Sequence, residues 1–232
     1  MTGLISAPDS GSFVFLSSYS RGVILREMGD DHATAREVSR KSDGHVRVLF
    51  LENDDSFTWN VVESLPVDRK CIRVRAGCEV AGAPPAIEAA DVIIVGPGPT
   101  DPVRAGIVKV VLIAAYLRRP LLGICLGHQA LGLAYGAKLI RVPPVHGKQT
   151  KIAFAPSRLF PSFTGTELVM RYNSLALMDV GAPLRVVAQT EDGIPMAIEH
   201  ETLPMAGLQF HPDSFGSPRG KEMIADFFRA VT

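Results

Sequence analysis

The sequence predicts an α/β fold: an open, mostly parallel central sheet flanked by helices, with added antiparallel strands. Three observations support this prediction. From Val46 onward, short apolar strand-like runs alternate with segments of helical spacing, which is typical of a parallel, doubly wound sheet. After about residue 138 the chain becomes rich in strand-like segments. Helical spacing then returns only in the last segment, 220–231.

The alternating part contains buried-type apolar strands, each followed by a helix or a glycine-rich loop. We expect Ser56 to cap the first helix, and Gly136 to end the last one. In order along the chain, the predicted elements are a strand at 46–53, a helix at 56–65, strands at 71–76 and 91–95, a helix at 105–119, a strand at 120–125 and a helix at 127–137.

The strand-rich part consists of segments that alternate in polarity or are rich in β-branched residues, as half-buried strands are. The residues "VHGKQ" between the first two are expected to form a loop. The predicted strands cover 138–142, 150–155, 167–173, 184–190, 195–200 and 205–211, and the final helix covers 220–231.

The pattern also divides the chain. Residues 46–232 are predicted to form one domain. Residues 1–45 form an extension to which the sequence assigns no role. Within it, 11–25 is compatible with a strand or hairpin, and 26–45 is polar and loosely helical.

Composition excludes several classes of protein. The formal net charge is zero, with 24 basic and 24 acidic residues, and no basic stripe indicates a nucleic-acid partner. Apolar runs such as "VKVVLIAAYL" are too short to span a membrane. The three cysteines, an odd number without metal or redox spacing, predict a cytoplasmic protein, and no secretion signal is evident at the start.

The stretch Gly123-Ile124-Cys125-Leu126-Gly127 joins a predicted strand to a predicted helix. It has the G-x-nucleophile-x-G form of a nucleophile elbow, with cysteine as the nucleophile. At a helix N-terminus the thiolate form is favoured, and the Leu126 N–H points to where an oxyanion would form. The alternative is a buried cysteine in a glycine-rich turn, and residues elsewhere in the chain are needed to distinguish the two interpretations.

A cysteine nucleophile needs a base. Of the six histidines, His211 is the best candidate because it ends an apolar strand in "LQFHPDSF". Pro212 favours an extended His211, so His211 and Asp213 are expected to project to the same side, as in a histidine–carboxylate pair. His128, on the elbow helix, is expected to pack.

Several motifs occur in order: "FLENDDSFTWNVV", "GPGPTDP", "PLLGICLGHQALGLAYGAK", "VHGKQTKI", "RYNSLAL" and "GLQFHPDSFGSPRG". Together they resemble class I, triad-type glutamine amidotransferases, whose fold is flavodoxin-like. The likeness is strongest to the small subunits of anthranilate synthase and aminodeoxychorismate synthase. It covers about residues 46–232.

The resemblance implies a role for each matching residue. Cys125 is the nucleophile that forms a γ-glutamyl thioester, His211 the general base and acid, and Asp213 the third triad member. The residues expected to bind L-glutamine or shape its pocket and oxyanion hole are Gly98, Pro99, Thr100, Leu126, Gln129, Ser174 and Leu175. The partner is a chorismate-binding synthase large subunit that receives ammonia. No metal and no cofactor are implied in this chain.

Three residues depart from the family pattern. The loop that usually reads PGPG is "PGPT", so Thr100 is expected to narrow the pocket or shift an oxyanion donor. Asn173 replaces the histidine of RYHSL, and Asp213 replaces a glutamate. Thr100 and Asn173 leave open a second function, a regulatory subunit of the same fold with weak activity. A third function is a free-standing cysteine hydrolase of γ-glutamyl compounds, against which "HGKQT" and "RYNSL" count. The sequence does not distinguish anthranilate from aminodeoxychorismate as the product.

Overall fold

The computed structural model describes residues 45–81 and 83–232, and the strands of these residues form one sheet of nine. The segment 11–25, for which the sequence suggests a strand or hairpin, lies outside the described residues, as do residues 26–44 of the loosely helical segment 26–45. The strands are β1 (Val48–Glu52), β2 (Ile72–Ala76), β3 (Val92–Val95), β4 (Leu121–Ile124), β5 (Lys138–Phe154), β6 (Gly165–Met178), β7 (Leu184–Thr190), β8 (Pro195–His200) and β9 (Met205–Leu208).

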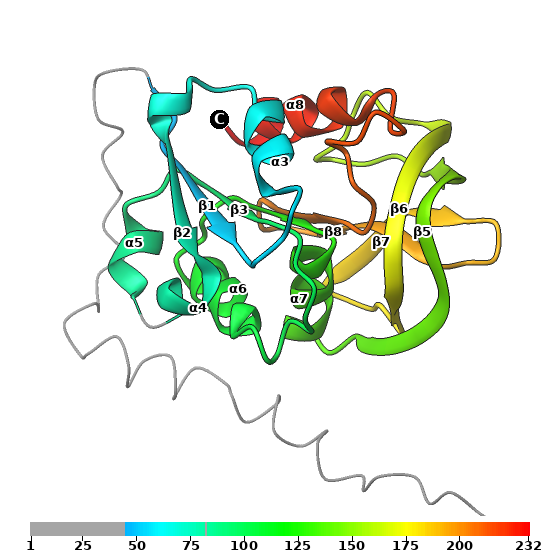
Figure 1. Ribbon diagram of the computed structural model, residues 1–232, viewed down its shortest axis with the longest axis horizontal. Helices are drawn as coiled ribbons and strands as arrows, with labels where there is room; N and C mark the ends of the chain where they lie inside the picture. Colours follow the sequence, from blue (N-terminus) through cyan, green and yellow to red (C-terminus); the bar gives the residue numbers. More distant parts are fainter. Residues whose placement is uncertain (1–44, 82) are drawn as a thin grey trace, which may run out of the picture. The chain divides into compact units, whose positions relative to one another are not determined.

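The helices cover both faces of the sheet (Figure 1). Helices α3 and α8 lie on one face, and α4, α5, α6 and α7 lie on the other. The bounds are α3 (Thr58–Ser64), α4 (Gly77–Val80), α5 (Pro84–Glu88), α6 (Ile107–Tyr116), α7 (Leu126–Ala134) and α8 (Gly220–Val231), with a 3-10 turn η3 at Arg69–Cys71.

The strand order is β2-β1-β3-β4-β9-β8-β7-β5-β6. The pairs from β2 to β9 are parallel, and those from β9 to β6 are antiparallel. This arrangement confirms the predicted fold class, a parallel α/β sheet extended by antiparallel strands.

The central parallel strands are buried on both faces, as expected where helices cover a sheet twice. Successive side chains of a strand point to opposite faces. In β1, Val48 and Phe50 therefore join the core under α3 and α8, while Leu49 and Leu51 join the core under α4–α7. The unbroken apolar runs of the sequence have this cause.

Three local predictions are wrong. The strand predicted at 205–211 ends at Leu208, so His211 lies beyond it. Ser56 does not cap α3. The N-cap position is Phe57, without a side-chain cap, and the Phe57 N–H instead donates to Asp55 Oδ1 at 2.8 Å. The segment "VHGKQ" is not a loop, because β5 continues through it and pairs with β6 across two register irregularities. Polar residues there reflect a strand with exposed positions rather than a turn.

Candidate active site

The sheet order brings the chemically distinctive segments to one edge. Strands β3, β4 and β9 are adjacent and parallel, so their carboxyl ends lie together, where open α/β sheets bind ligands. The "GPGPT" loop follows β3, Cys125 follows β4, and the segment from Gln209 to Asp213 follows β9. These segments lie far apart in the sequence, and only the topology makes them neighbours.

Cys125 occupies the turn between β4 and α7 in a strained conformation. Its φ is +51° and its ψ −96°, a combination that residues other than glycine rarely adopt. Its N–H donates to Leu208 O on β9 at 2.8 Å, and its carbonyl accepts the N–H of Gln129 at 3.1 Å. The residue is 8% exposed and precedes the first N–H groups of α7, which have no partner inside the helix. This is the geometry of a nucleophile elbow.

The elbow depends on close backbone packing. A Cβ on Gly123 would lie 2.7 Å from the backbone nitrogen of His128 and even closer to the Gly127 carbonyl. A Cβ on Gly127 would lie 2.5 Å from Val95 O. The two glycines therefore let the start of α7 pack directly on β3 and β4, which fixes where Cys125 projects.

Gly123→Ala is expected to lower the free energy of unfolding by about 3 kcal/mol, because backbone that cannot yield has to move. The matched control is Gly181→Ala, since nothing lies within 4 Å of a Cβ there. Thermal unfolding of both variants measures the difference. Equal melting temperatures would contradict the packing argument.

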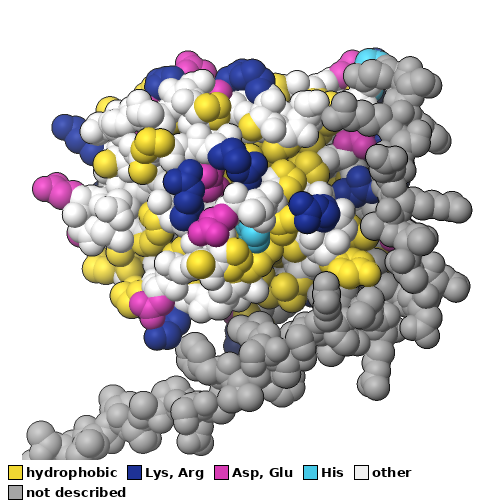
Figure 2. Space-filling model, turned by 180° about the vertical axis from the view of Figure 1, so that it is seen from behind, with side chains coloured by type: hydrophobic (Ala, Val, Ile, Leu, Met, Phe, Trp, Pro, Cys, Tyr) yellow, Lys and Arg dark blue, Asp and Glu magenta, His cyan; other side chains and the backbone are white. Residues whose placement is uncertain are grey.

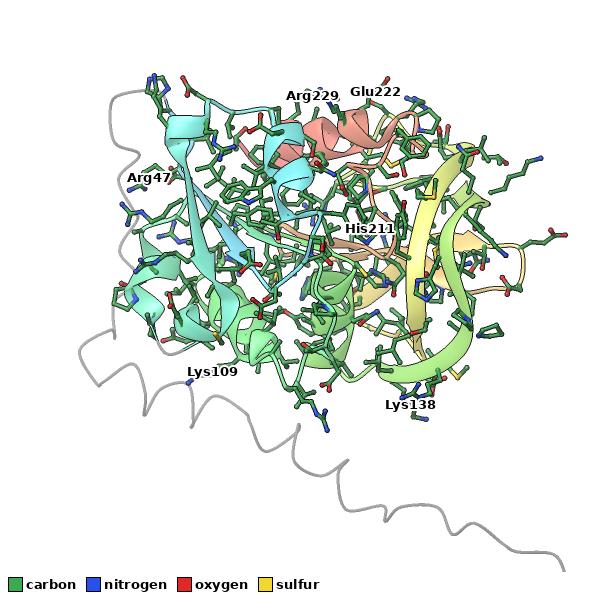
Figure 3. All side chains as sticks on the ribbon, in the orientation of Figure 1. Arg47, Lys109, Lys138, His211, Glu222 and Arg229 are labelled. Atoms are coloured by element: carbon green, nitrogen blue, oxygen red, sulfur yellow. The ribbon has the colours of Figure 1, made fainter. Side chains whose placement is uncertain are left out.

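His211 is positioned by β6 and by aromatic rings. Its backbone N–H donates to Met170 O at 3.0 Å, and Ser217 Oγ donates to the backbone carbonyl of His211 at 2.7 Å. The ring has edge-on contacts with Tyr172 and Phe57, whose centroids lie 5.1 Å and 5.9 Å away. Figure 3 shows His211 between helix α7 and strand β6. The imidazole is thus fixed in a largely buried position.

The electrostatics of His211 are set by two neighbours. Burial lowers the pKa of His211, but interactions with the side chains of Asp213 and Cys125 outweigh it and raise the pKa to about 10. His211 Nδ1 and Asp213 Oδ1 are 3.6 Å apart, which is an ion-pair distance but longer than a hydrogen bond. Both atoms are buried and make no hydrogen bond. Both neighbours therefore favour the charged imidazolium of His211, although the distance to Asp213 leaves the orienting hydrogen bond unmade.

Of the seven residues expected to bind substrate, four form two contacting pairs: Gln129 with Leu175, and Gly98 with Leu126. Gln129 is buried on α7, and its Nε2 donates to Leu175 O at 3.3 Å. Gly98 is in contact with Leu126, because a Cβ there would lie 2.8 Å from Leu126 Cδ2. Because Leu126 and Gln129 lie on α7, both pairs are connected to the helix that begins at the elbow. The remaining three residues are Ser174, which is half-buried, and Pro99 and Thr100, which are exposed.

Thr100 has a backbone conformation that does not require glycine. It is absent from the positive-φ residues of the described chain, and its Oγ1 donates only a 3.5 Å hydrogen bond to Asp101 O. The structure thus gives no backbone reason for a glycine at this position. The predicted narrowing of the pocket by Thr100 stays a prediction.

Asn173, the second departure, supports β6 rather than the nucleophile. Its Oδ1 accepts from Arg171 Nε at 3.1 Å, and its Nδ2 donates to Leu175 O at 3.0 Å. The Leu175 carbonyl therefore accepts hydrogen bonds from both Asn173 and Gln129. Asn173 thus contacts Leu175, one of the residues expected to bind substrate.

Other residues near the site were not identified from the sequence. Asn53, after β1, donates to Gly96 O at 3.1 Å and secures the loop that follows β3. Phe57 and Tyr172 flank His211, and Gln209 reaches Cys125. Their only sequence signal is their place at strand ends or in the quoted motifs. Contacts between distant segments cannot be deduced from that.

His128, three residues after Cys125, is fully buried, which confirms the expectation that it packs. Burial lowers its pKa from 6.5 to about 4, with a small opposing effect from the Gly207 backbone, and neither ring nitrogen makes a well-formed hydrogen bond. The folded protein therefore keeps His128 neutral. The stability linked to this is fully present above pH 6.5 and is lost as the pH falls toward 4.

His128→Met is expected to remove part of the acid sensitivity. At pH 5 the unsubstituted chain should lose about 2 kcal/mol from this group relative to pH 7, and the variant should not. Urea unfolding of both proteins at pH 7 and pH 5 gives the comparison. Carboxylates titrate alike in both, so a parallel loss in the variant would show that His128 is not responsible.

The remaining surface is mixed in charge. Figure 2 shows basic and acidic side chains interspersed on the face opposite to that of Figure 1. Within 45–81 and 83–232, no helix has the length and apolarity to cross a bilayer, and no three His, Cys, Asp or Glu side chains are arranged as a metal site.

A strained cysteine at a strand-to-helix turn, beside a buried histidine–carboxylate pair, defines an α/β protein of the nucleophile-elbow type. The chain belongs to the class-I glutamine amidotransferase family, whose family model matches residues 49–231. The family predicted from the motifs is thereby confirmed.

Two named relatives are similar to this chain. The chain is 37% identical over 185 residues to aminodeoxychorismate synthase of Streptomyces griseus, covering 78% of this chain and 26% of that protein. It is 35% identical over 188 residues to anthranilate synthase component 2 of Azospirillum brasilense, covering 79% and 96%. The chain thus spans about a quarter of the first relative and nearly all of the second.

A solved structure supports the fold. A glutamine amidotransferase from Thermotoga maritima superposes with a TM-score of 0.59 at 14% identity, covering 81% of this chain and 96% of that one. At this identity the likeness bears on the fold alone.

Proposed function

We propose that the chain is a glutaminase subunit that hydrolyses L-glutamine through a thioester at Cys125 and delivers ammonia to a chorismate-binding synthase subunit. The observation that carries this proposal is the strained backbone of Cys125 beside the buried His211–Asp213 pair. The names of the relatives supply the pathway. Residues 46–232 are proposed to be the amidotransferase domain, and 1–45 remain without an assigned role.

The proposed reaction follows from the positions of these groups. Cys125 Sγ attacks the carboxamide carbon of glutamine, and a C–S bond forms while the carbonyl oxygen becomes an oxyanion. The Leu126 N–H, at the start of α7, stabilises that charge. The imidazolium of His211 gives its proton to the nitrogen, the C–N bond breaks, and ammonia leaves.

The second half regenerates the enzyme. His211, now neutral, takes a proton from water, and the resulting hydroxide attacks the thioester carbon. The C–S bond breaks and returns the thiolate, the new γ-carboxylic acid leaves and loses its proton to water as glutamate, and the proton on His211 restores the starting state. Ammonia then adds to chorismate in the partner, so the amination itself takes place outside this chain.

A weakly active regulatory subunit is the second candidate, and one distance favours it. The 3.6 Å between His211 Nδ1 and Asp213 Oδ1 leaves the orienting hydrogen bond unmade. The Asn173 substitution does not favour it, because Asn173 bonds to Arg171 and Leu175 and not to the groups that react.

The test combines trapping with turnover. A glutamine-like diazoketone should label Cys125 and leave Cys71 and Cys78 unlabelled, as read by peptide mass spectrometry; all three cysteines are free. Glutamate release should rise strongly on addition of chorismate together with a chorismate-binding large subunit. Supplying the anthranilate-type or the aminodeoxychorismate-type large subunit in parallel identifies the product. Trapping without turnover by either complex would instead support the regulatory role.

A further inference from the structure

The carboxamide of Gln209 lies against the sulfur of Cys125. Gln209 follows β9, is fully buried, and its Nε2 is 3.6 Å from Cys125 Sγ, within hydrogen-bonding range for sulfur. Its backbone N–H donates to Met196 O on β8 at 2.8 Å. The sheet therefore fixes the backbone of Gln209, and contacts with Gln129 and Cys125 hold its carboxamide.

The orientation of this carboxamide follows from a chain of hydrogen bonds. A backbone carbonyl only accepts, so the Gln129 atom 3.3 Å from Leu175 O has to be the amide nitrogen. The same nitrogen is 3.2 Å from Gln209, so the Gln209 atom facing it has to be the oxygen. The opposite side of the carboxamide, which faces Cys125, is then the NH₂ group.

We propose that Gln209 is the hydrogen-bond donor that stabilises and aims the Cys125 thiolate, and that Gln129 is a positioning residue that acts through Gln209. The inference deepens the proposed function, on which it rests, by assigning two residues to the nucleophile itself. A hydrogen bond to an anion is stronger than one to a neutral group, so the side-chain amide of Gln209 favours the thiolate form of Cys125 over the thiol. It also restricts the direction of Sγ, which a single ion pair with His211 does not do.

This arrangement leaves one group of Gln129 for a ligand. Its Nε2 is used by Leu175 and Gln209, whereas within the described chain its Oε1 accepts no hydrogen bond. A substrate N–H that binds Oε1 would tighten the same chain of hydrogen bonds. Substrate binding and the orientation of the nucleophile are thereby connected through one side chain.

The test is the pH dependence of Cys125 alkylation by iodoacetamide, followed by peptide mass spectrometry. Gln209→Met keeps the shape of the side chain and removes the donor. We expect the pH profile of Cys125 alkylation to move to higher pH, so that alkylation on the acid side of the profile slows about tenfold. Cys71 and Cys78 in the same sample should react at unchanged rates.

Two further variants separate a donor from a merely structural residue. Gln209→Glu is nearly isosteric but places a carboxylate beside the sulfur, so it should slow alkylation at least as much. Gln189→Met makes the same chemical change as the first variant on the exposed surface of β7 and should alter nothing. Circular dichroism melts confirm that each variant is folded.

The role of Gln129 is tested by a double-mutant cycle. If Gln129 acts through Gln209, then Gln129→Met should have a smaller effect than Gln209→Met. The double variant should equal Gln209→Met rather than the product of both effects. Multiplying effects would show that Gln129 acts on the sulfur by another route.

An unchanged alkylation profile in folded Gln209→Met and Gln209→Glu would overturn the proposal. The readout needs neither glutamine nor the partner. If the profile shifts as expected while the unsubstituted protein releases no glutamate with any partner, the role of Gln209 stands and the proposed glutaminase function fails.

Discussion

Cys125→Ser should reduce glutamine-dependent product formation by at least roughly 10³-fold, while formation from added ammonia stays within about a factor of two. A serine hydroxyl is not ionised beside His211, so the attack on the carboxamide loses its nucleophile. Ammonia bypasses the thioester and reacts in the partner. The measurement is product formation by the complex with each nitrogen source.

The design contains its own control for folding. Serine is close to cysteine in size, and the elbow is held by Gly123, Gly127 and the hydrogen bond from the Cys125 N–H to Leu208. The variant should therefore fold and bind the partner, and intact ammonia-dependent activity verifies both. Normal turnover with glutamine would show that Cys125 is not the nucleophile.

Much of the fold was predictable because burial leaves a clear pattern. The parallel strands are covered on both faces, so β1, β3 and β4 appear in the sequence as continuous apolar runs. The final helix was predicted with its observed bounds, because α8 has one apolar face with Met223, Ile224, Phe227 and Phe228. Short elements such as α4 and α5 were missed, since a single turn has too few residues for periodicity.

The candidate site was predictable in part, for a similar reason. Cys125 and His211 stand in local motifs, and each motif has its own physical signature. Gln209 and Asn53 have none, because their contacts depend on the order β1-β3-β4-β9 of the sheet. That order is set by crossover connections, and no local pattern specifies which strands become neighbours.

The β5/β6 pair shows how an exposed strand escapes prediction. "VHGKQ" has a glycine and several polar residues, which are the features of a turn. In the structure Gly147 has a φ of +64° and lies at one of the register irregularities of β5. The glycine therefore marks a bulge within a long strand rather than its end.

His211→Ala is expected to lower glutamate release by the complex by about 10³-fold, and Asp213→Ala by about 10 to 10²-fold. His211 transfers the protons, whereas Asp213 only orients the ring and stabilises its charge. The 3.6 Å separation of Nδ1 and Oδ1 makes this orienting contact weaker than a hydrogen bond. Equal losses from both variants would point to structural collapse or a different role for Asp213.

The pH profile distinguishes these roles further. Against the lowering effect of burial, the side-chain interaction with Asp213 is the largest single influence that raises the pKa of His211 to about 10, and Cys125 contributes as well. Removing the carboxylate should therefore bring the alkaline loss of activity to a lower pH in Asp213→Ala, because the imidazolium that protonates the leaving nitrogen is lost earlier. Asp213→Glu supplies the matched control: it keeps the carboxylate, on a side chain one methylene longer, and should keep the alkaline limb near that of the unsubstituted protein. An alkaline limb that does not move in Asp213→Ala would mean that the carboxylate does not hold the charge of His211, whatever the loss in rate.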